Sequence, residues 1–392
     1  MKYNFDEIVP RQNTDCYKVE GLQDLCGRTD VLPLWVADMD FRTPPFVFEA
    51  INRRLQQGIL GYTCGMPSYK EAICRWVKAR HGMDIAPEMV SYVPGVVSGI
   101  FLAIQAFTEK GDKVLIQEPV YHPFRIVSEA TGRTVVKNTL RRTAESFEMD
   151  FESLERDLQG CKMMVLCNPH NPAGICWSED TLRRVAELCK QAGVLVVSDE
   201  IHCDMVLPGH RHVPFSTVST TAHDLSITLQ APSKTFNIPG IVVSHAIVPN
   251  AQLRERYFGY IEGTDQDLGN VFAYDCARAC YTEQGNEWRI QMLDYVQGNI
   301  DCVDEFLRRH CPRIRAIRPE ASFLVFLDCR DLGLPHSALE DFFVNQARLA
   351  LNSGSMFGAS GEGYMRMNVA CPRSVVEQAL QQLQTAYQTL DS

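Results

Sequence analysis

The stretch MMVLCNPHNPAGICWSEDTLRRVAELCKQAGVLVVSD (163–199) decides the fold of this chain. It opens and closes with continuous apolar runs at 163–167 and 194–198, which are typical of strands buried on both faces. Between them apolar residues recur at helical spacing, from Ser178 as a suitable N-cap to Gly193 as a suitable C-cap. Strand, helix and strand in this order indicate a βαβ unit and so predict a parallel sheet.

The same alternation continues on both sides of this stretch. Further apolar runs rich in β-branched residues lie at 89–93, 114–117, 225–229 and 241–248. We therefore predict an α/β fold with a mostly parallel sheet between helices. After residue 285 the character changes to polar helical stretches around two short apolar runs, 322–328 and 363–369, and a terminal amphipathic helix at 374–390.

This change of character predicts two domains. A large α/β domain would span residues 46–285. A smaller α+β domain would combine residues 1–45 with residues 286–392, because the first 45 residues lack strong periodicity and are expected to pack against the C-terminal part. The length of 392 residues is ample for two buried cores.

Composition excludes several classes of protein. The chain is 45% hydrophobic and 22% charged, which argues against disorder, and its formal net charge of −10 argues against a nucleic-acid binder. The uncharged stretch 89–107 approaches the length of a membrane span, but Pro94 and Gly95 interrupt it. The first residues contain no apolar signal-peptide core. The 15 scattered cysteines are expected to be reduced thiols, so we predict a cytoplasmic protein.

A metal site is not predicted. His202, Cys203, His210 and His212 are of ligand type, but their spacing matches no standard zinc site.

Polar residues follow the predicted strands at the edge of the sheet where ligands bind in open α/β folds. Lys234 follows the run 225–229, and a desolvated lysine there would be a nucleophile toward aldehydes; the alternative is a strand-end lysine that reaches solvent. Asp199 follows the run 194–198, and it would either cap the next helix or hold a pyridinium nitrogen protonated.

The other strand ends carry a turn, an amide and an aromatic ring. Gly95, Val96 and Val97 open a helix whose free amides and dipole suit a phosphate group, although many strand–turn–helix units share this pattern. Asn171 in NPHNPAG either donates to a ring oxygen or forms an Asn-Pro turn. Tyr121 either stacks on a planar cofactor or fills the core.

Arg366 lies inside the predicted strand 363–369. A buried arginine needs an anion, which would be either a substrate carboxylate or an internal ion-pair partner.

The joint order of these motifs resembles a known family. NPHNPAG, SDEIHCDMV, APSKTFNIPG and RMNVACPR, at these intervals, resemble the fold-type I pyridoxal-phosphate (PLP) enzymes of the aminotransferase class I/II superfamily. The segments WVADMDF (35–41), GYT (61–63) and IHCDMV (201–206) are similar to the cystathionine β-lyase branch of the PatB/MalY type, a group of carbon–sulfur lyases. The resemblance extends over essentially the whole chain.

The resemblance implies a role for each residue. Lys234 would bind PLP covalently, Asp199 would pair with the pyridine nitrogen, and Asn171 would bond the phenolic oxygen. The remaining implied contacts are Tyr121 stacked on the ring, His202 beside the ring, the amides of Gly95, Val96 and Val97 with Ser233 on the phosphate, and Arg366, Asn171 and Ala37 around the substrate. Many relatives place an arginine eight residues after the lysine, whereas this chain has Val242.

The resemblance also implies a homodimer and a reaction. Tyr62 of the partner subunit would complete the phosphate site. The reaction would be β-elimination, in which Lys234 removes the α-proton and cystathionine yields homocysteine, pyruvate and ammonia; either Tyr121 or Tyr62 would protonate the leaving sulfur. One alternative is an aminotransferase, which would depend on an added keto acid. Another is a cofactor-bound regulator or scaffold that acts through a protein partner.

Overall fold

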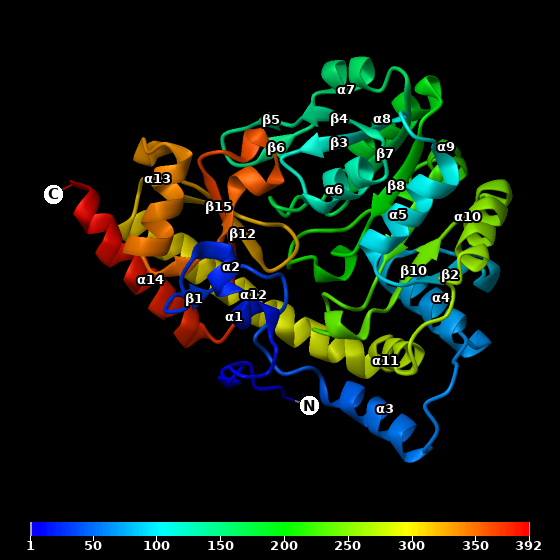
Figure 1. Cartoon of the computed structure of the whole chain (residues 1–392), viewed down its shortest axis with the longest axis horizontal. Coiled ribbons are helices and arrows are strands. Elements are labelled where there is room, and N and C mark those ends of the chain that lie inside the picture. The colour runs from blue at the N-terminus through cyan, green and yellow to red at the C-terminus, as the bar shows by residue number, and fades with distance from the viewer. Residues whose placement is uncertain (1, 392) are drawn as a thin grey trace.

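The computed structural model describes residues 2–391, and a seven-stranded sheet forms its centre (Figure 1). The strands occur in the order β2 (Val90–Val93), β10 (Ser244–Ile247), β9 (Ser226–Gln230), β8 (Leu195–Asp199), β7 (Cys161–Cys167), β3 (Lys113–Glu118) and β4 (Thr134–Thr139). The pairs from β9 to β4 are all parallel, whereas β10 is antiparallel to both of its neighbours. The predicted α/β fold with a mostly parallel sheet is therefore confirmed.

Both faces of this sheet are buried, as the continuous apolar runs predict. On β7, Met163 and Val165 pack on one face, and Met164 and Leu166 pack on the other. The surrounding helices are α5 (Val96–Phe107), α6 (Pro123–Ala130), α7 (Phe151–Asp157), α8 (Glu179–Ala192), α9 (Thr220–Asp224) and α10 (Ala251–Gly263). Helix α8 begins after Ser178, whose side chain accepts from the amide of Thr181, and it ends at left-handed Gly193, as predicted.

Two details of the predicted sheet differ from the structure. The run 241–248 becomes a strand only at Ser244, because residues Pro239–Ile241 form a 3₁₀ turn and Val242 has a φ of 53°. Strand β4 was not predicted, because it is an edge strand with exposed polar positions and lacks a continuous apolar run.

A second sheet of four antiparallel strands lies beside the first. Its order is β11 (Arg315–Ile317), β12 (Leu324–Asp328), β15 (Tyr364–Asn368) and β14 (Asn352–Ser353). The strands predicted at 322–328 and 363–369 correspond to β12 and β15, and the predicted terminal helix is α14 (Arg373–Tyr387). The segment before residue 45 packs here, because β1 (Leu32–Pro33) pairs with β13 (Leu349–Ala350).

The chain has further helices and one small hairpin outside the two sheets. The helices are α1 (Tyr17–Glu20), α2 (Leu22–Cys26), α3 (Pro45–Gln56), α4 (Pro67–His81), α11 (Ala273–Cys280), α12 (Glu283–His310) and α13 (His336–Asp341), and a small hairpin pairs β5 (Arg141–Arg142) with β6 (Phe147–Glu148). The long helix α12 runs from α11 across to α14 (Figure 1). No helix among residues 2–391 is long and apolar enough to cross a membrane.

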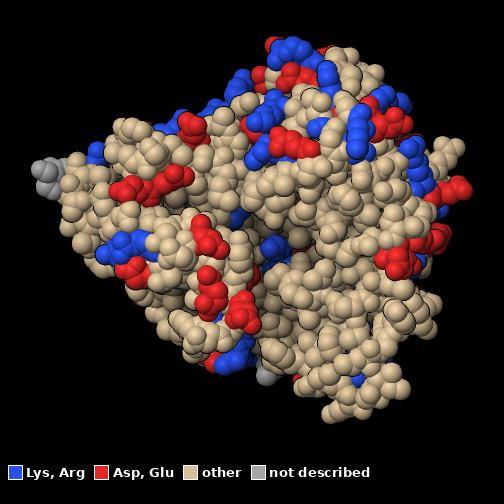
Figure 2. All heavy atoms as spheres, in the orientation of Figure 1, with Lys and Arg blue, Asp and Glu red and all other residues tan. Residues whose placement is uncertain are grey.

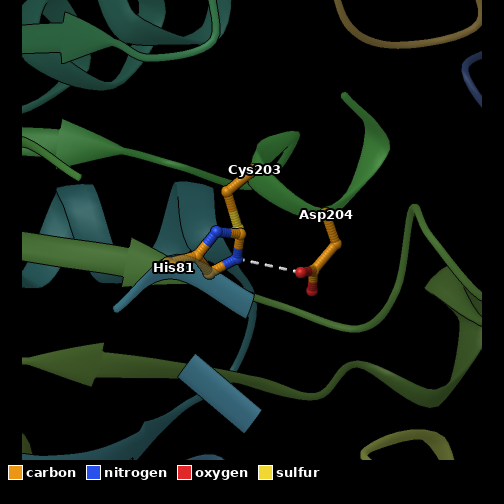
Figure 3. Close-up of side chains that lie close together, drawn as sticks. All are labelled: His81, Cys203 and Asp204. Atoms are coloured by element: carbon orange, nitrogen blue, oxygen red, sulfur yellow. Dashed lines mark hydrogen bonds and ion pairs between the residues drawn. The ribbon is translucent and has the colours of Figure 1, made fainter. Parts of the chain in front are cut away.

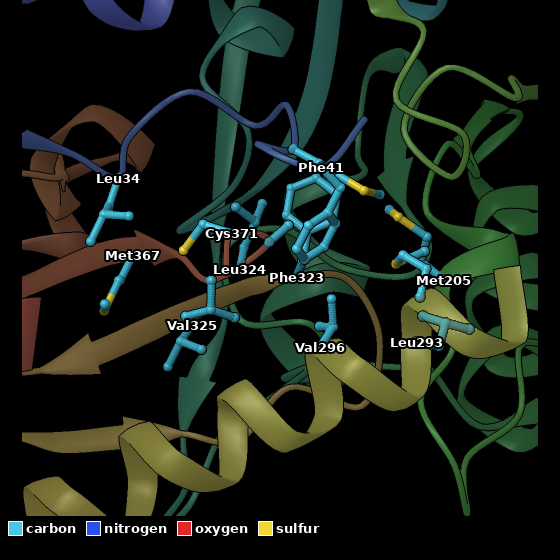
Figure 4. Packing of buried hydrophobic residues seen from close by; sticks show 14 of the residues in the cluster. Leu34, Phe41, Met205, Leu293, Val296, Phe323, Leu324, Val325, Met367 and Cys371 are labelled. Atoms are coloured by element: carbon cyan, nitrogen blue, oxygen red, sulfur yellow. The ribbon is translucent and has the colours of Figure 1, made fainter. Parts of the chain in front are cut away.

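One apolar core joins distant parts of the chain along α12. Val296 of α12 points toward Phe323, Leu293 lies nearer Met205, and Phe41 packs on the same cluster (Figure 4). Met205, from the turn that follows β8, is buried there too. This core therefore fixes the segment near residue 41, the four-stranded sheet and the edge of the large sheet relative to one another.

Candidate active site

A cavity of about 210 Å³ lies at the carboxyl ends of the parallel strands. Its walls include ten of the residues proposed from the sequence: Ala37, Gly95, Val96, Val97, Tyr121, Asn171, Asp199, His202, Ser233 and Lys234. A hollow with Lys or Arg atoms on its floor is visible near the middle of the molecule in Figure 2. The strand ends that are separate in sequence therefore meet at one place, as the parallel topology predicts.

Lys234 is only partly exposed and is held inside the cavity. Its Nζ donates a hydrogen bond to the carbonyl oxygen of Ala37 at 2.7 Å, across 197 positions of sequence. Burial lowers the pKa of Lys234 to about 8, although the nearby charge of Asp38 raises it. A substantial fraction of this amine is neutral near pH 8, as a nucleophile or general base requires.

Asp199 is the buried acid of the cavity. Its Oδ1 accepts from the amide of Ile201 at 3.0 Å. Burial raises the pKa of Asp199 to about 7, the charge of Glu200 raises it further, and the charge of Lys234 lowers it. A cationic partner within the cavity would favour the ionised form of this carboxylate, and a protonated ring nitrogen has that charge.

His202 lies in the cavity as a neutral ring. Burial lowers the pKa of His202 to about 3, and the positive charges of Lys234 and Arg366 lower it as well. Its Nδ1 is buried and has no hydrogen-bond partner among the described residues. Because buried polar atoms are normally hydrogen-bonded, the unpaired Nδ1 of His202 indicates that a bound polar group is its partner.

The start of helix α5 provides the anion-binding end of the cavity. Gly95 is its N-cap with a φ of 101°, a conformation that favours glycine, and no side chain caps the helix. The amides of Val96 and Val97 therefore retain donor capacity, and the Ser233 hydroxyl lies in the same cavity. Val242 lines this end in the left-handed conformation. The donor set suits a phosphate group without an arginine at position 242.

Arg366 approaches the cavity from β15 of the smaller sheet. Its guanidinium donates to Oδ1 of Asn171 at 3.0 Å, to the Trp35 carbonyl at 3.3 Å and to Oδ1 of Asn352 at 2.5 Å. Burial lowers the pKa of Arg366 to about 10. Among residues 2–391 no carboxylate forms an ion pair with it, so the alternative of an internal ion pair is wrong for the described chain. A buried cation without an anion favours an anionic ligand.

Tyr62 is not part of the cavity in this chain. Its side chain is fully exposed, and it lies between α3 and α4 near other exposed apolar residues, including Ile59, Leu60 and Met66. Its assignment to a neighbouring subunit stays a prediction.

The sequence profile of the aminotransferase class I and II family matches residues 29–383. The chain belongs to this family. Cystathionine β-lyase PatB of Bacillus subtilis (strain 168) is 39% identical over 98% of this chain and 99% of that protein. Protein MalY of Escherichia coli (strain K12) is 33% identical over 96% of this chain and 97% of that protein. Among solved structures, PLP-containing cystalysin from Treponema denticola has a TM-score of 0.96 with 32% identity, covering 100% of both chains.

Some residues of this family member's site were not found from its sequence. Asn352 contacts Arg366 from the two-residue strand β14, which carries no sequence pattern. Cys167 also lines the cavity, and its Sγ accepts from the amide of Asn171 at 3.3 Å. Because Cys167 ends the predicted strand 163–167, inspection of the last residue of each strand would have found it.

Proposed function

We propose that this protein is a PLP-dependent carbon–sulfur lyase that performs β-elimination on cystathionine or related cysteine S-conjugates. The observation that carries the proposal is the meeting, in one cavity, of the amine of Lys234, the buried carboxylate of Asp199 and the uncapped start of α5. The full-length similarity to cystathionine β-lyase PatB supports lyase chemistry over transamination within this family.

The residues present fit PLP. Lys234 would hold the aldehyde covalently, Asp199 the ring nitrogen, and Asn171 the phenolic oxygen. Tyr121 would stack on the ring, and His202 would lie beside it. The amides of Val96 and Val97 with Ser233 would hold the phosphate, whereas the Gly95 amide already donates to the Val93 carbonyl oxygen at 2.9 Å. Bound PLP supplies an electrophilic carbon and a ring that withdraws electrons from the substrate Cα.

Arg366 would fix the substrate by its α-carboxylate. Its planar fork suits a carboxylate, and the hydrogen bond to Asn171 orients it toward the large sheet. Ala37 faces the same cavity and presents its carbonyl to Lys234. The substrate α-carbon would then lie within reach of the Lys234 amine.

Lys234 would act as the general base. Its lowered pKa, about 8, allows the neutral amine to remove the proton from Cα at mildly alkaline pH. The thiolate at Cβ leaves with the electron pair of the C–S bond. Loss of the proton and the thiolate, followed by addition of water, gives pyruvate, ammonia and the free thiol, so cystathionine would yield homocysteine.

A phenol would protonate the leaving sulfur. Tyr121 lies in the cavity, and burial raises its pKa, so its hydroxyl keeps its proton at neutral pH. Tyr62 of the partner subunit is the alternative donor.

The functional assembly would be a homodimer in the cytoplasm. The face over α3 carries few charged residues (Figure 2), and Phe48 and Leu55 are exposed there, close in sequence to Tyr62. None of the 15 cysteines forms a disulfide, which supports a reducing compartment.

Product analysis tests the reaction. The PLP-loaded protein is incubated separately with cystathionine, cystine and methionine, and pyruvate and free thiol are measured with and without an added keto acid. We expect pyruvate from cystathionine and cystine without a keto acid, and none from methionine, whose sulfur is on Cγ. Turnover that requires a keto acid would identify an aminotransferase. Bound cofactor without turnover on any amino acid would favour the regulatory alternative.

A further inference from the structure

A cluster of ligand-type side chains lies beside the candidate active site. It joins His81, the last residue of α4, with Cys203 and Asp204 of the 3₁₀ turn Cys203–Met205 that follows β8 (Figure 3). Nε2 of His81 lies 2.9 Å from Oδ1 of Asp204, and one ligand atom from each of the three residues lies within 4.8 Å of the others. Only Cys203 belongs to the set considered from the sequence.

We propose that His81, Cys203 and Asp204 bind a zinc ion. Imidazole, thiolate and carboxylate are the ligands that Zn²⁺ takes in proteins, at bonds of about 2.0–2.3 Å. A tetrahedral ion with such bonds holds its ligand atoms roughly 3–4 Å apart. The His81 and Asp204 atoms, at 2.9 Å, are already near this spacing, and a pair at the 4.8 Å limit would have to close by about 1–2 Å. One thiolate and one carboxylate neutralise the two positive charges of the ion, which avoids a net charge at this buried position.

Hydrogen bonds from neighbouring side chains hold Asp204 in an orientation that suits metal binding. Nε1 of Trp76 donates to Oδ2 of Asp204 at 2.8 Å, which leaves Oδ1 directed at His81. Arg289 donates to the backbone carbonyl of Asp204 at 3.1 Å and so holds the turn. Such outer contacts fix the direction of ligands in metal sites.

A cavity of about 340 Å³ gives access to the cluster, and both His81 and Cys203 line it. His212 lines the same cavity, and its ring lies 5.2 Å from that of His81. Its Nε2 contacts Oε2 of Glu200 at 3.0 Å, whereas its Nδ1 is buried without a partner among the described residues. His212 lies beside the cluster but is not one of the three residues whose ligand atoms gather within 4.8 Å, so its ring would support the site from outside.

The proposed site is separate from the PLP cavity but adjoins it. Cys203 follows His202 directly, and His202 lines the PLP cavity. A zinc ion would therefore tie the end of α4 to the turn after β8 without contacting substrate. The proposal does not depend on the proposed lyase activity, because it concerns a different set of side chains.

Metal binding is tested on the PLP-loaded protein. After treatment with a chelator and dialysis, Zn²⁺ is titrated and bound metal is counted; Co²⁺ is then used as a spectroscopic probe in the visible red, where PLP does not absorb. We expect one tightly bound ion per chain, ligand-field bands of a tetrahedral Co²⁺ site and a higher thermal midpoint with Zn²⁺.

Two variants and two controls decide the assignment. Cys203→Ser and His81→Gln each remove one ligand. Each variant should lose the one tightly bound metal ion per chain and the ligand-field bands of bound Co²⁺. Cys161→Ser keeps a hydroxyl for the Asp157 carbonyl that its thiol now contacts, and His223→Gln changes an exposed histidine; both should bind metal like the parent protein. If Cys203→Ser does not fold, His81→Gln alone carries the test. Unchanged binding in a folded ligand variant, or absence of a tight ion in the parent protein, overturns the proposal.

Discussion

Arg366 donates to Asn171 at 3.0 Å, and this one hydrogen bond joins the four-stranded sheet to the carboxyl end of the large sheet. The two residues are 195 positions apart in sequence. The bond holds the guanidinium at the candidate site while leaving it without a carboxylate partner among the described residues. The side chain proposed to bind the substrate carboxylate therefore also links the two sheets.

Arg366→Ala should lower kcat/KM for amino-acid substrates while PLP still binds. Loss of a desolvated charged pair costs about 2–5 kcal/mol, equal to a fall of roughly 30- to 5000-fold. Arg366→Lys keeps the charge but loses the fork, so an intermediate loss is expected. Steady-state kinetics and the absorption spectrum of bound cofactor are the measurements. Loss of cofactor or of folding would instead indicate that Arg366 acts mainly as a structural link.

Lys234→Ala should abolish covalent attachment of PLP and reduce turnover by at least about 100-fold, because the general base is lost. Borohydride reduction followed by mass spectrometry of the peptides measures the attachment. Lys190→Ala on α8 provides a control lysine away from the cavity. A reduced adduct on another lysine of the Lys234→Ala protein would show that the residue assignment is wrong.

Tyr62 should complete the active site of the other subunit. Chains carrying Lys234→Ala are mixed with chains carrying Tyr62→Phe. If Tyr62 crosses the interface, each hybrid dimer has one intact site, and random mixing should restore roughly a quarter of the parent activity. The test requires nearly inactive single variants and verified hybrids. Verified hybrids without any gain would mean that each chain supplies its own Tyr62.

Asp199 should make the stability of the cofactor-free protein fall as pH rises. Its pKa is about 7 in the folded chain and near 4 when unfolded, so the folded state binds more protons between these values. Relative to Asp199→Asn, the parent protein should lose about 2 kcal/mol of unfolding free energy between pH 5 and pH 7.

Lys234 has the opposite shift, so its own contribution rises with pH only above about pH 8. Urea unfolding at several pH values measures the Asp199 effect, with the exposed Asp24→Asn as control. Parallel pH profiles for the parent and Asp199→Asn proteins would contradict the predicted shift.

Gly174 of the NPHNPAG motif should not tolerate a side chain. Its φ is +70°, and a Cβ there would lie 2.4 Å from the Cβ of Pro319. Gly193 has a φ of +69° but open space around it, so Gly193→Ala measures the backbone cost alone, about 1–2 kcal/mol. Gly174→Ala should cost about 1–3 kcal/mol more in urea unfolding. Equal losses in the two variants would show that the segment near Pro319 moves aside freely.

The central strands and most of the site were predictable because local patterns encode them. Strand β8 is a continuous apolar run, and Asp199 ends it. Parallel pairing with β7 and β9 then brings its end beside those of its neighbours. The fold class and the main cavity residues therefore follow from short-range sequence features together with the rule that ligands bind at the carboxyl ends of parallel strands.

The missed features depend on contacts between distant positions. Asn352 faces Arg366 because β14 pairs with β15, and two residues of strand give no pattern by themselves. His81 and Asp204 are 123 positions apart, so no spacing rule groups them. Their proximity follows only from the packing of α4 against the rest of the chain.

The segment 34–39 has a consequence for how the protein is made. Its backbone accepts two hydrogen bonds from the Asn368 side chain, at Val36 and Asp38, and another from Lys234 at Ala37. Asn368 is synthesised more than 300 residues after its partners. During translation the large sheet can assemble before β15, which binds residues 34–39, has been synthesised. The contacts between residues 34–39 and Asn368 therefore form only after β15 has been synthesised, and contacts between such distant positions favour slower folding.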